Sequence, residues 1–208
     1  MSWPSRPLVN PSDVDQSRNG LLLPDDLKDV FAPGLGIGKA HHQFARAHRA
    51  LQFQMWAETG QSLTFTSLAD VYRTYQVQEA VFRKRRTTKY NPITCQSKTK
   101  RKFWNGEWWY LLRFMAECAT PGLSNHGNGL AGDMALWVEV KPGVWRIMGL
   151  GTNEWAAAWA LEHFPTFGFY WNVSSEFWHL EFCLGDVVPQ RVLDVENMIG
   201  LPYWLKAA

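Results

Sequence analysis

The chain has 208 residues, of which 46% are hydrophobic and 19% are charged, and its formal net charge is +2. This length suits one catalytic domain with a short appendage, and the apolar content is enough for a sizeable core. No apolar run reaches the ~18 residues of a membrane-spanning helix. The three cysteines, Cys95, Cys118 and Cys183, form no C-x-x-C pair and cannot all pair within one chain. We therefore expect reduced thiols and synthesis in a reducing cytoplasm.

Residues 1–37 predict an extended arm rich in proline and glycine, and residues 38–208 predict a single domain. The arm shows no basic-then-apolar signal pattern, so we expect a protein that reaches its target without a standard secretion signal. The glycine run over residues 33–38 is not a phosphate loop, because no strand precedes it and no Lys-Ser/Thr follows it.

Residues 39–58 predict a helix that stops at Gly60. Its apolar face is formed by Phe44, Ala47, Leu51 and Met55. Three histidines fall in the same segment, His41, His42 and His48, and we expect them to form an exposed cluster on the helix.

The rest of the chain predicts an α+β fold, in which a small antiparallel sheet is covered by helices on one side. Asn105-Gly106 suits a type I′ turn and predicts a hairpin. The expected strands are about 63–66, 98–104, 107–113, 130–140, 144–149 and 175–184, and the expected helices are about 75–87, 153–163 and 192–199.

A basic block lies between Glu79 and Glu107, with nine Lys/Arg and no acid. We favour a solvated helix end and edge strand, where lysines discourage sheet-to-sheet pairing. An anionic cell-wall polymer is the second interpretation. Nucleic acid is the least favoured partner, because no nucleic-acid module signature accompanies the charges.

Two short segments about forty residues apart concentrate the candidate chemistry, residues 124–133 and 176–181. In the first, the glycines after His126 let the backbone bend sharply, so that His126 and Asp133 can meet at one point. In the second, Glu176 and His179 are three residues apart, and on a strand they would face opposite sides. A bend before His179 would be needed to bring Glu176 to the same place. Two histidines and one carboxylate could bind zinc with one coordination position open, and the fourth residue could take a proton from water.

These segments resemble the S-x-H-x-x-G-x-A-x-D and E-x-W-H motifs of the zinc D-alanyl-D-alanine peptidases. That family includes the vancomycin-resistance D,D-peptidases and the peptidase domains of many phage lysins. A third element, residues 72–78, resembles the family's arginine followed by a short helix, and the likeness covers roughly residues 65–183. Every fixed motif position matches: Ser124, His126, Gly129, Ala131, Asp133, Glu176, Trp178 and His179.

The resemblance implies a hedgehog/D-Ala-D-Ala peptidase-like fold whose sheet carries one Zn²⁺ per chain, held by His126, Asp133 and His179. It implies that Glu176 is the general base and that Arg73 stabilises the oxyanion. Substrate contacts are expected from Ser124, Gln78 and Trp178, with Trp171 as a further candidate for the cleft. Two alternatives stay open, that Ser124 is a turn residue and that Gln78 is structural. Glu181 either orients the His179 ring or is a rim charge, and both alternatives stay open.

The function implied is a zinc-dependent peptidoglycan peptidase, foremost a D-alanyl-D-alanine carboxypeptidase. The absent signal pattern and the lysin-like motifs suggest a bacteriophage product that degrades the bacterial cell wall. It would sit in the virion tail, docked on other tail proteins through the arm, or in the host cytoplasm before release as a lysin. Two alternatives are an endopeptidase that cuts the L-Ala–D-Glu bond or a cross-bridge, and a virion structural or binding protein on an inactive scaffold.

Overall fold

The computed structural model describes residues 3–200, and a central antiparallel sheet organises most of them. The strand order in this sheet is β3 (Ser62–Phe65), β7 (Ala131–Lys141), β10 (His179–Phe182) and β9 (Phe169–Tyr170). The long strand β7 pairs with β10 through residues 131–133 and with β8 (Val144–Gly149) through residues 135–141. The predicted α+β class, with a small antiparallel sheet, is confirmed.

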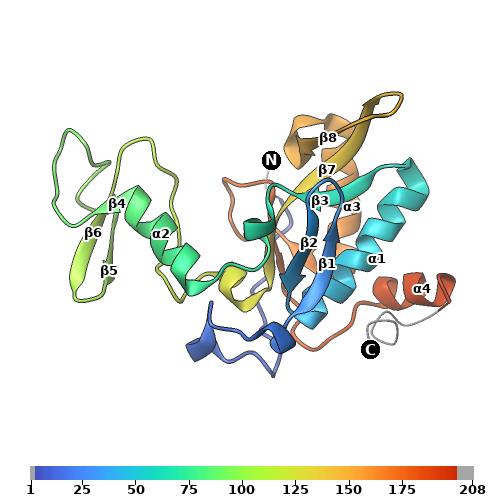
Figure 1. The fold of residues 1–208 in the computed structure, drawn as a ribbon, viewed down its shortest axis with the longest axis horizontal. Helices are drawn as coiled ribbons and strands as arrows, with labels where there is room; N and C mark the ends of the chain where they lie inside the picture. Colours follow the sequence, from blue (N-terminus) through green and yellow to red (C-terminus); the bar gives the residue numbers. More distant parts are fainter. Residues whose placement is uncertain (1–2, 201–208) are drawn as a thin grey trace.

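Helix α1 (His42–Thr59) packs directly on this sheet. A Cβ atom added to Gly132 of β7 would lie 2.8 Å from the Phe44 ring, so only glycine permits this approach. The predicted apolar face of α1 is confirmed, because Phe44, Ala47, Leu51 and Met55 are all buried. Gly60 ends the helix in the left-handed conformation, with φ of 68°. Helices α3 (Glu154–His163) and α4 (Gln190–Met198) complete the same core, and α4 lies against α1 (Figure 1).

The N-terminal region forms more regular structure than an extended arm. Strands β1 (Lys28–Ala32) and β2 (Gly36–Ala40) pair as a hairpin, and Val30, Ala32 and Ala40 join the main core. The expected division between residues 37 and 38 falls inside β2. The reason is that the hairpin alternates buried and exposed residues and covers part of α1 and β3 with its buried face.

The expectation of an exposed histidine cluster on α1 is wrong. His48 is 1% exposed and packs against the rings of Phe44 and Phe65, and His41 is 4% exposed. Helix α1 is covered on more than one side, by the sheet, by the hairpin and by α4. A sequence pattern that indicates one apolar face therefore underestimates how much of α1 is buried.

A side lobe, residues 75–118, projects from the main body in Figure 1. It contains α2 (Tyr75–Arg85) and a three-stranded sheet of order β4 (Arg86–Thr87), β6 (Glu107–Leu111) and β5 (Arg101–Trp104). The hairpin predicted at Asn105-Gly106 is confirmed, with both residues at positive φ, 51° and 82°. The lobe has a small core of its own around Phe82, Trp109 and Leu111, outside the main hydrophobic cluster.

The last sheet strand is shorter than predicted. β10 spans only residues 179–182, because the backbone N–H of His179 bonds back to the carbonyl of Glu176 at 3.0 Å and makes a turn there. The predicted helix at 192–199 corresponds to α4, and residues 201–208 of the predicted domain lie outside the described residues. Among residues 3–200, no helix has the length and apolarity needed to cross a bilayer.

Candidate functional site

The glycine-rich segment forms a tight loop that presents His126. A 3-10 turn, η4 (Asn125–Asn128), ends at Gly129 in the left-handed region with φ of 67°. A Cβ atom on Gly129 would lie 2.5 Å from the backbone nitrogen of His41, whose N–H bonds to the Gly129 carbonyl at 3.0 Å. This loop therefore needs glycine both for its conformation and for its close contact with the start of α1.

A buried junction with the N-terminal segment holds the same loop in place. The side-chain amide of Asn19 donates to the carbonyl of Ser124 and to Oδ1 of Asn128, both at 2.8 Å. Its Oδ1 accepts from Nε2 of Gln78 at 3.1 Å. Asn19 is 2% exposed, and its role could not be predicted because nothing near residue 19 in the chain signals a contact with residues 124–128.

Gln78 has a structural place in this junction. Its Nε2 also donates to the carbonyl of Arg73 at 3.1 Å, and its Oε1 accepts from the backbone N–H of Gly122 at 2.9 Å. The side chain is buried, and the hydrogen bonds of its amide group go to other residues of the chain. We therefore assign Gln78 a structural role, in which it fixes the loop and the backbone of Arg73. This role replaces the substrate contact expected from the sequence.

The sheet brings the other two candidate ligands together. His179 of β10 stands directly opposite Asp133 of β7 in the antiparallel register, so their side chains project from the same face. The loop then carries His126 to the same place. Nδ1 of His179 lies 2.8 Å from Oδ1 of Asp133, and Nε2 of His126 lies 3.4 Å from that oxygen and 3.3 Å from Nδ1 of His179. One nitrogen from each ring and one carboxylate oxygen thus converge on a single point.

The outward nitrogen of each ring is also occupied. Nδ1 of His126 lies 3.1 Å from the carbonyl of Val71, and Nε2 of His179 lies 3.3 Å from Oε1 of Glu181. Donation from these nitrogens leaves the lone pairs of the inward nitrogens directed at the shared point, as metal-binding histidines require. Glu181 is fixed in turn by the amides of Asn125 and Asn172, each at 2.7 Å. The structure thus places Glu181 behind His179, so the alternative of a rim charge is wrong.

The electrostatics of the cluster favour a negative carboxylate between positive or polar partners. Burial alone would raise the pKa of Asp133, but hydrogen bonds from His126 and His179 outweigh it and hold that pKa below its usual range. Burial alone would lower the pKa of His179, but hydrogen bonds to Asp133 and Glu181 raise it to about 9. A proton and a metal ion would compete for Nδ1 of His179, because both need the lone pair of that nitrogen.

Arg73 reaches the edge of this cluster. Its guanidinium lies 2.8 Å from Oδ1 of Asp70 and 3.8 Å from Oδ2 of Asp133, and its side chain is 17% exposed. Its backbone N–H donates to the carbonyl of His126 at 3.0 Å. The sequence separates Arg73 from His126 by more than fifty residues, and the junction around Asn19 and Gln78 brings them together.

Three further residues from the motifs lie close to the candidate ligands in the chain. Glu176 is half-buried in the turn that precedes His179, and within residues 3–200 its carboxylate makes no hydrogen bond or ion pair. Trp178 is 43% exposed and borders His179 in the chain. Ser124 is 8% exposed at the start of the loop, and its hydroxyl makes no capping bond.

Comparisons with known proteins show a likeness in structure and none in sequence. No protein-family model matches the sequence, and no curated protein matches it. A solved structure described as VanYB in complex with D-Alanine-D-Alanine is similar to this chain, with 16% sequence identity and a TM-score of 0.46. The alignment covers 97% of this chain and 96% of that chain. A likeness of this degree decides nothing about the reaction.

The expected cleft role of Trp171 is wrong. The Trp171 ring is 2% exposed and is stacked between Phe164 and Phe177, at centroid distances of 5.7 and 5.3 Å. Its indole N–H donates to the carbonyl of Phe177 at 2.7 Å. Core packing accounts for this tryptophan in full.

A second group of possible ligands is less suited to a metal. Nε2 of His41 and Nε2 of His42 each lie 3.0 Å from the carboxylate of Asp13. Nδ1 of His41 accepts a hydrogen bond from the backbone N–H of Gln43 at 3.3 Å, so the neutral ring carries its proton on Nε2. That proton is donated to Asp13 and occupies the position that a metal ion would need.

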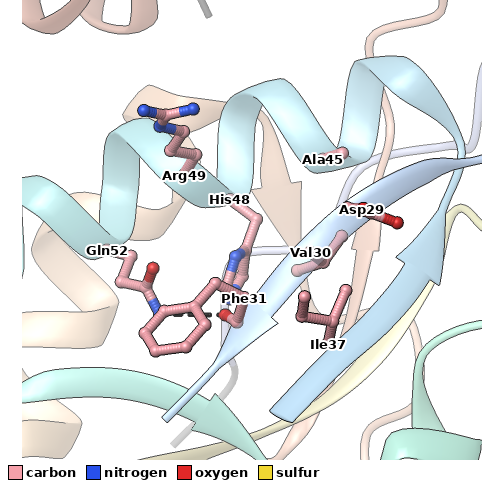
Figure 2. A pocket seen from close by; sticks show the side chains of 8 residues that line it. All are labelled: Asp29, Val30, Phe31, Ile37, Ala45, His48, Arg49 and Gln52. Atoms are coloured by element: carbon pink, nitrogen blue, oxygen red, sulfur yellow. Dashed lines mark hydrogen bonds between the residues drawn. The ribbon is translucent and has the colours of Figure 1, made fainter. Parts of the chain in front are cut away.

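A cavity of about 370 Å³ lies between α1 and the β1–β2 hairpin. Figure 2 shows His48, Arg49 and Gln52 approaching it from the helix, and Asp29, Val30, Phe31 and Ile37 from the two strands. Nε2 of His48 is buried and has no hydrogen-bond partner among the described residues. Because that atom is closed to solvent, a molecule in the cavity could not reach it without displacing the ring.

Proposed function

We propose that this chain is a zinc-dependent peptidase that hydrolyses the stem peptides of peptidoglycan, foremost as a D-alanyl-D-alanine carboxypeptidase. The observation that carries the proposal is the convergence of Nε2 of His126, Oδ1 of Asp133 and Nδ1 of His179. These atoms come from the loop of η4 and from the paired strands β7 and β10.

The residues fit zinc by the chemistry of their donor atoms. Two imidazole nitrogens and one carboxylate oxygen make a protein ligand set typical of catalytic zinc, with a fourth position left for water or substrate. The carbonyl of Val71 and the carboxylate of Glu181 support the outward ring nitrogens. A bound zinc ion would supply Lewis acidity toward a carbonyl oxygen and would acidify water.

Glu176 is proposed as the group that moves the proton. The turn at residues 176–179 sets it next to His179, and its carboxylate is uncommitted among the described residues, so it is available to accept a proton and return it to the leaving amine. Arg73 is proposed to stabilise the negative charge that develops on the scissile carbonyl oxygen. Its guanidinium is partly buried and is anchored by Asp70, which limits the reorganisation needed during the reaction.

Trp178 and Ser124 are proposed as substrate contacts. The exposed indole of Trp178, which precedes His179 in the chain, offers an apolar surface, and the Ser124 hydroxyl can donate to a peptide carbonyl. Ser124 is not proposed as a nucleophile, because both histidines of the cluster are engaged as ligands and leave no base for its hydroxyl.

The setting that we propose is a bacteriophage, with the protein in the virion tail or released as a lysin. In the tail, the residues before β1 would dock on a larger assembly. A tail component should copurify with intact phage particles. Absence of the protein from the particles would favour a lysin.

The decisive experiment joins metal analysis to product analysis. Purified protein should hold about one zinc per chain, and Glu176→Gln should keep the metal while losing on the order of 10²–10⁴ in hydrolysis rate. Glu154→Gln, an exposed residue of α3, is the matched control and should behave as the wild type.

Mass spectrometry of digested peptidoglycan then names the bond. Release of free D-alanine would support carboxypeptidase activity. New amino termini within the stem or cross-bridge would instead support endopeptidase activity. Zinc binding without any cleavage would favour a binding protein on an inactive scaffold. A protein that holds no zinc with His126 intact would end the proposal.

A further inference from the structure

The sheet of the side lobe has two different faces. On one face, Trp104 and Trp109 pack against Phe82 of α2, with ring centroids 5.3 and 5.6 Å apart. This face is the core of the lobe, since Phe82 and Trp109 are buried. Nothing in residues 3–200 requires aromatic residues on the opposite face for the same purpose.

The opposite face nevertheless carries a row of aromatic side chains. Phe103 pairs with Trp108 and Arg101 pairs with Tyr110 across β5 and β6, so all four side chains project from one side. Phe103 is 57% exposed and Trp108 is 45% exposed, with their centroids 5.3 Å apart. The row continues through Tyr110 to Tyr90, whose rings are also 5.3 Å apart. We call this surface, residues 90, 101, 103, 108 and 110, the aromatic face.

Positive charge on the aromatic face is modest, in contrast to the basic block as a whole. The guanidinium of Arg101 lies 4.3 Å from the Trp108 ring centroid, and the ammonium of Lys98 lies 5.5 Å from that of Tyr90. Other cations of the block are engaged within the lobe. Arg83 pairs with Glu79, Arg86 with Glu117, and Lys102 donates to the Cys118 carbonyl.

We propose that the aromatic face binds the glycan strands of peptidoglycan. The C–H groups of a sugar ring meet the negative face of an aromatic ring favourably, and a pair such as Phe103 and Trp108 offers adjoining surfaces for one strand. Arg101 and Lys98 complement the carboxylates of the stem peptides. A nucleic acid would require cations for many phosphates, and several cations of the block are already used internally.

This inference rests on the proposed function for its choice of polymer, and it adds a second contact point to that polymer. The side lobe projects from the body that carries the zinc ligands (Figure 1). A chain held on a glycan strand through the lobe would meet nearby stem peptides at a raised effective concentration.

The test measures binding of full-length protein to insoluble peptidoglycan from which covalently attached phosphate polymers have been removed. Co-sedimentation at a series of protein concentrations gives a Kd without any need for hydrolysis. The double variant Phe103→Ala/Trp108→Ala should raise that Kd about tenfold or more, the cost typical of truncating the aromatic anchors of an interface. Arg101→Gln, which keeps the shape of the strand, should raise it about two- to fivefold and reduce its salt dependence.

Trp56→Ala is the matched control, because Trp56 is 59% exposed on α1 and lies outside the lobe. Its Kd should equal that of the wild type. Circular dichroism checks that the lobe variants remain folded, as expected for side chains that leave the lobe core intact. Variants of the aromatic face that bind peptidoglycan as tightly as the wild type would overturn the proposal. Binding that is lost when the phosphate polymers are removed would also overturn it. The same holds if the variants weaken binding to a single-stranded oligonucleotide but not to peptidoglycan.

A second assay separates this proposal from the proposed function. On a soluble pentapeptide, the lobe variants should keep the wild-type kcat/KM, and on insoluble peptidoglycan they should lose rate in proportion to binding. If no form of the protein cleaves either substrate but the lobe variants still lose binding, the proposed function fails and the binding surface stands.

Discussion

Replacing Glu181 by glutamine should weaken zinc binding although Glu181 is not a ligand. Three donors meet the two oxygens of this buried carboxylate. Oε1 accepts from Asn125 at 2.7 Å and from His179 at 3.3 Å, and Oε2 accepts from Asn172 at 2.7 Å. Glutamine keeps the shape but turns one acceptor into a donor, so at least one of these three donors loses its partner.

The magnitude follows from the role of the lost contact. Loss of the group that orients a metal-binding histidine typically costs 10–100-fold in metal affinity, which is about 1.4–2.8 kcal/mol. The fixed negative charge behind the His179 ring also disappears, which lowers the basicity of the inward nitrogen. Both effects act in the same direction, so we expect the upper half of that range for Glu181→Gln.

Competition with a chelating dye measures the zinc Kd of the wild type, of Glu181→Gln and of Glu162→Gln. Glu162 is an exposed glutamate of α3, outside the cluster, and serves as the control for loss of one carboxylate. Urea unfolding of the metal-free proteins shows whether a change in affinity merely follows a loss of fold. A zinc Kd for Glu181→Gln within threefold of the wild type would refute the reasoning, because the outward nitrogen of His179 would then not depend on Glu181.

Two other predictions concern the loop and the core. Gly127→Ala should destabilise the fold and loosen zinc binding, because the added Cβ would lie 2.1 Å from Oδ1 of Asn19 and 2.3 Å from Nε2 of Gln78. Gly38→Ala is the control, because its added Cβ would lie at an ordinary 3.4 Å from the nearest atom and neither glycine has a positive φ. Equal melting temperatures for the two variants would contradict the argument. Burial lowers the pKa of His48 to about 3, so this residue contributes stability that is present above its usual value near 6.5 and is lost as the pH falls from there toward 3. Urea unfolding of wild type and His48→Phe between pH 7.5 and 4 should show the wild type losing up to about 1.4 kcal/mol per pH unit relative to the variant, and parallel curves would exclude an unprotonated buried His48.

Much of the local structure could be predicted from neighbouring residues. The Asn105-Gly106 turn depends on two adjacent residues, and the apolar face of α1 follows from the spacing of its residues along the helix; both appear where the sequence pattern placed them. The candidate ligands were also visible in the sequence, because glycines around His126 and the polar residues in an aromatic segment are unusual. Their meeting in space depends on a strand pairing, His179 opposite Asp133, that the sequence analysis did not predict.

The amino-acid sequence by itself determined which residue types were available for chemistry and which short segments would turn, extend or coil. Tertiary structure alone decided the surroundings of each one. It buried Trp171 and His48 and placed Gln78 inside a junction instead of a cleft. It also brought Asn19 to the loop of His126 and Glu181 to the back of His179. The physical reason is that burial and hydrogen bonding depend on partners from distant parts of the chain, and a side chain's type leaves those partners open.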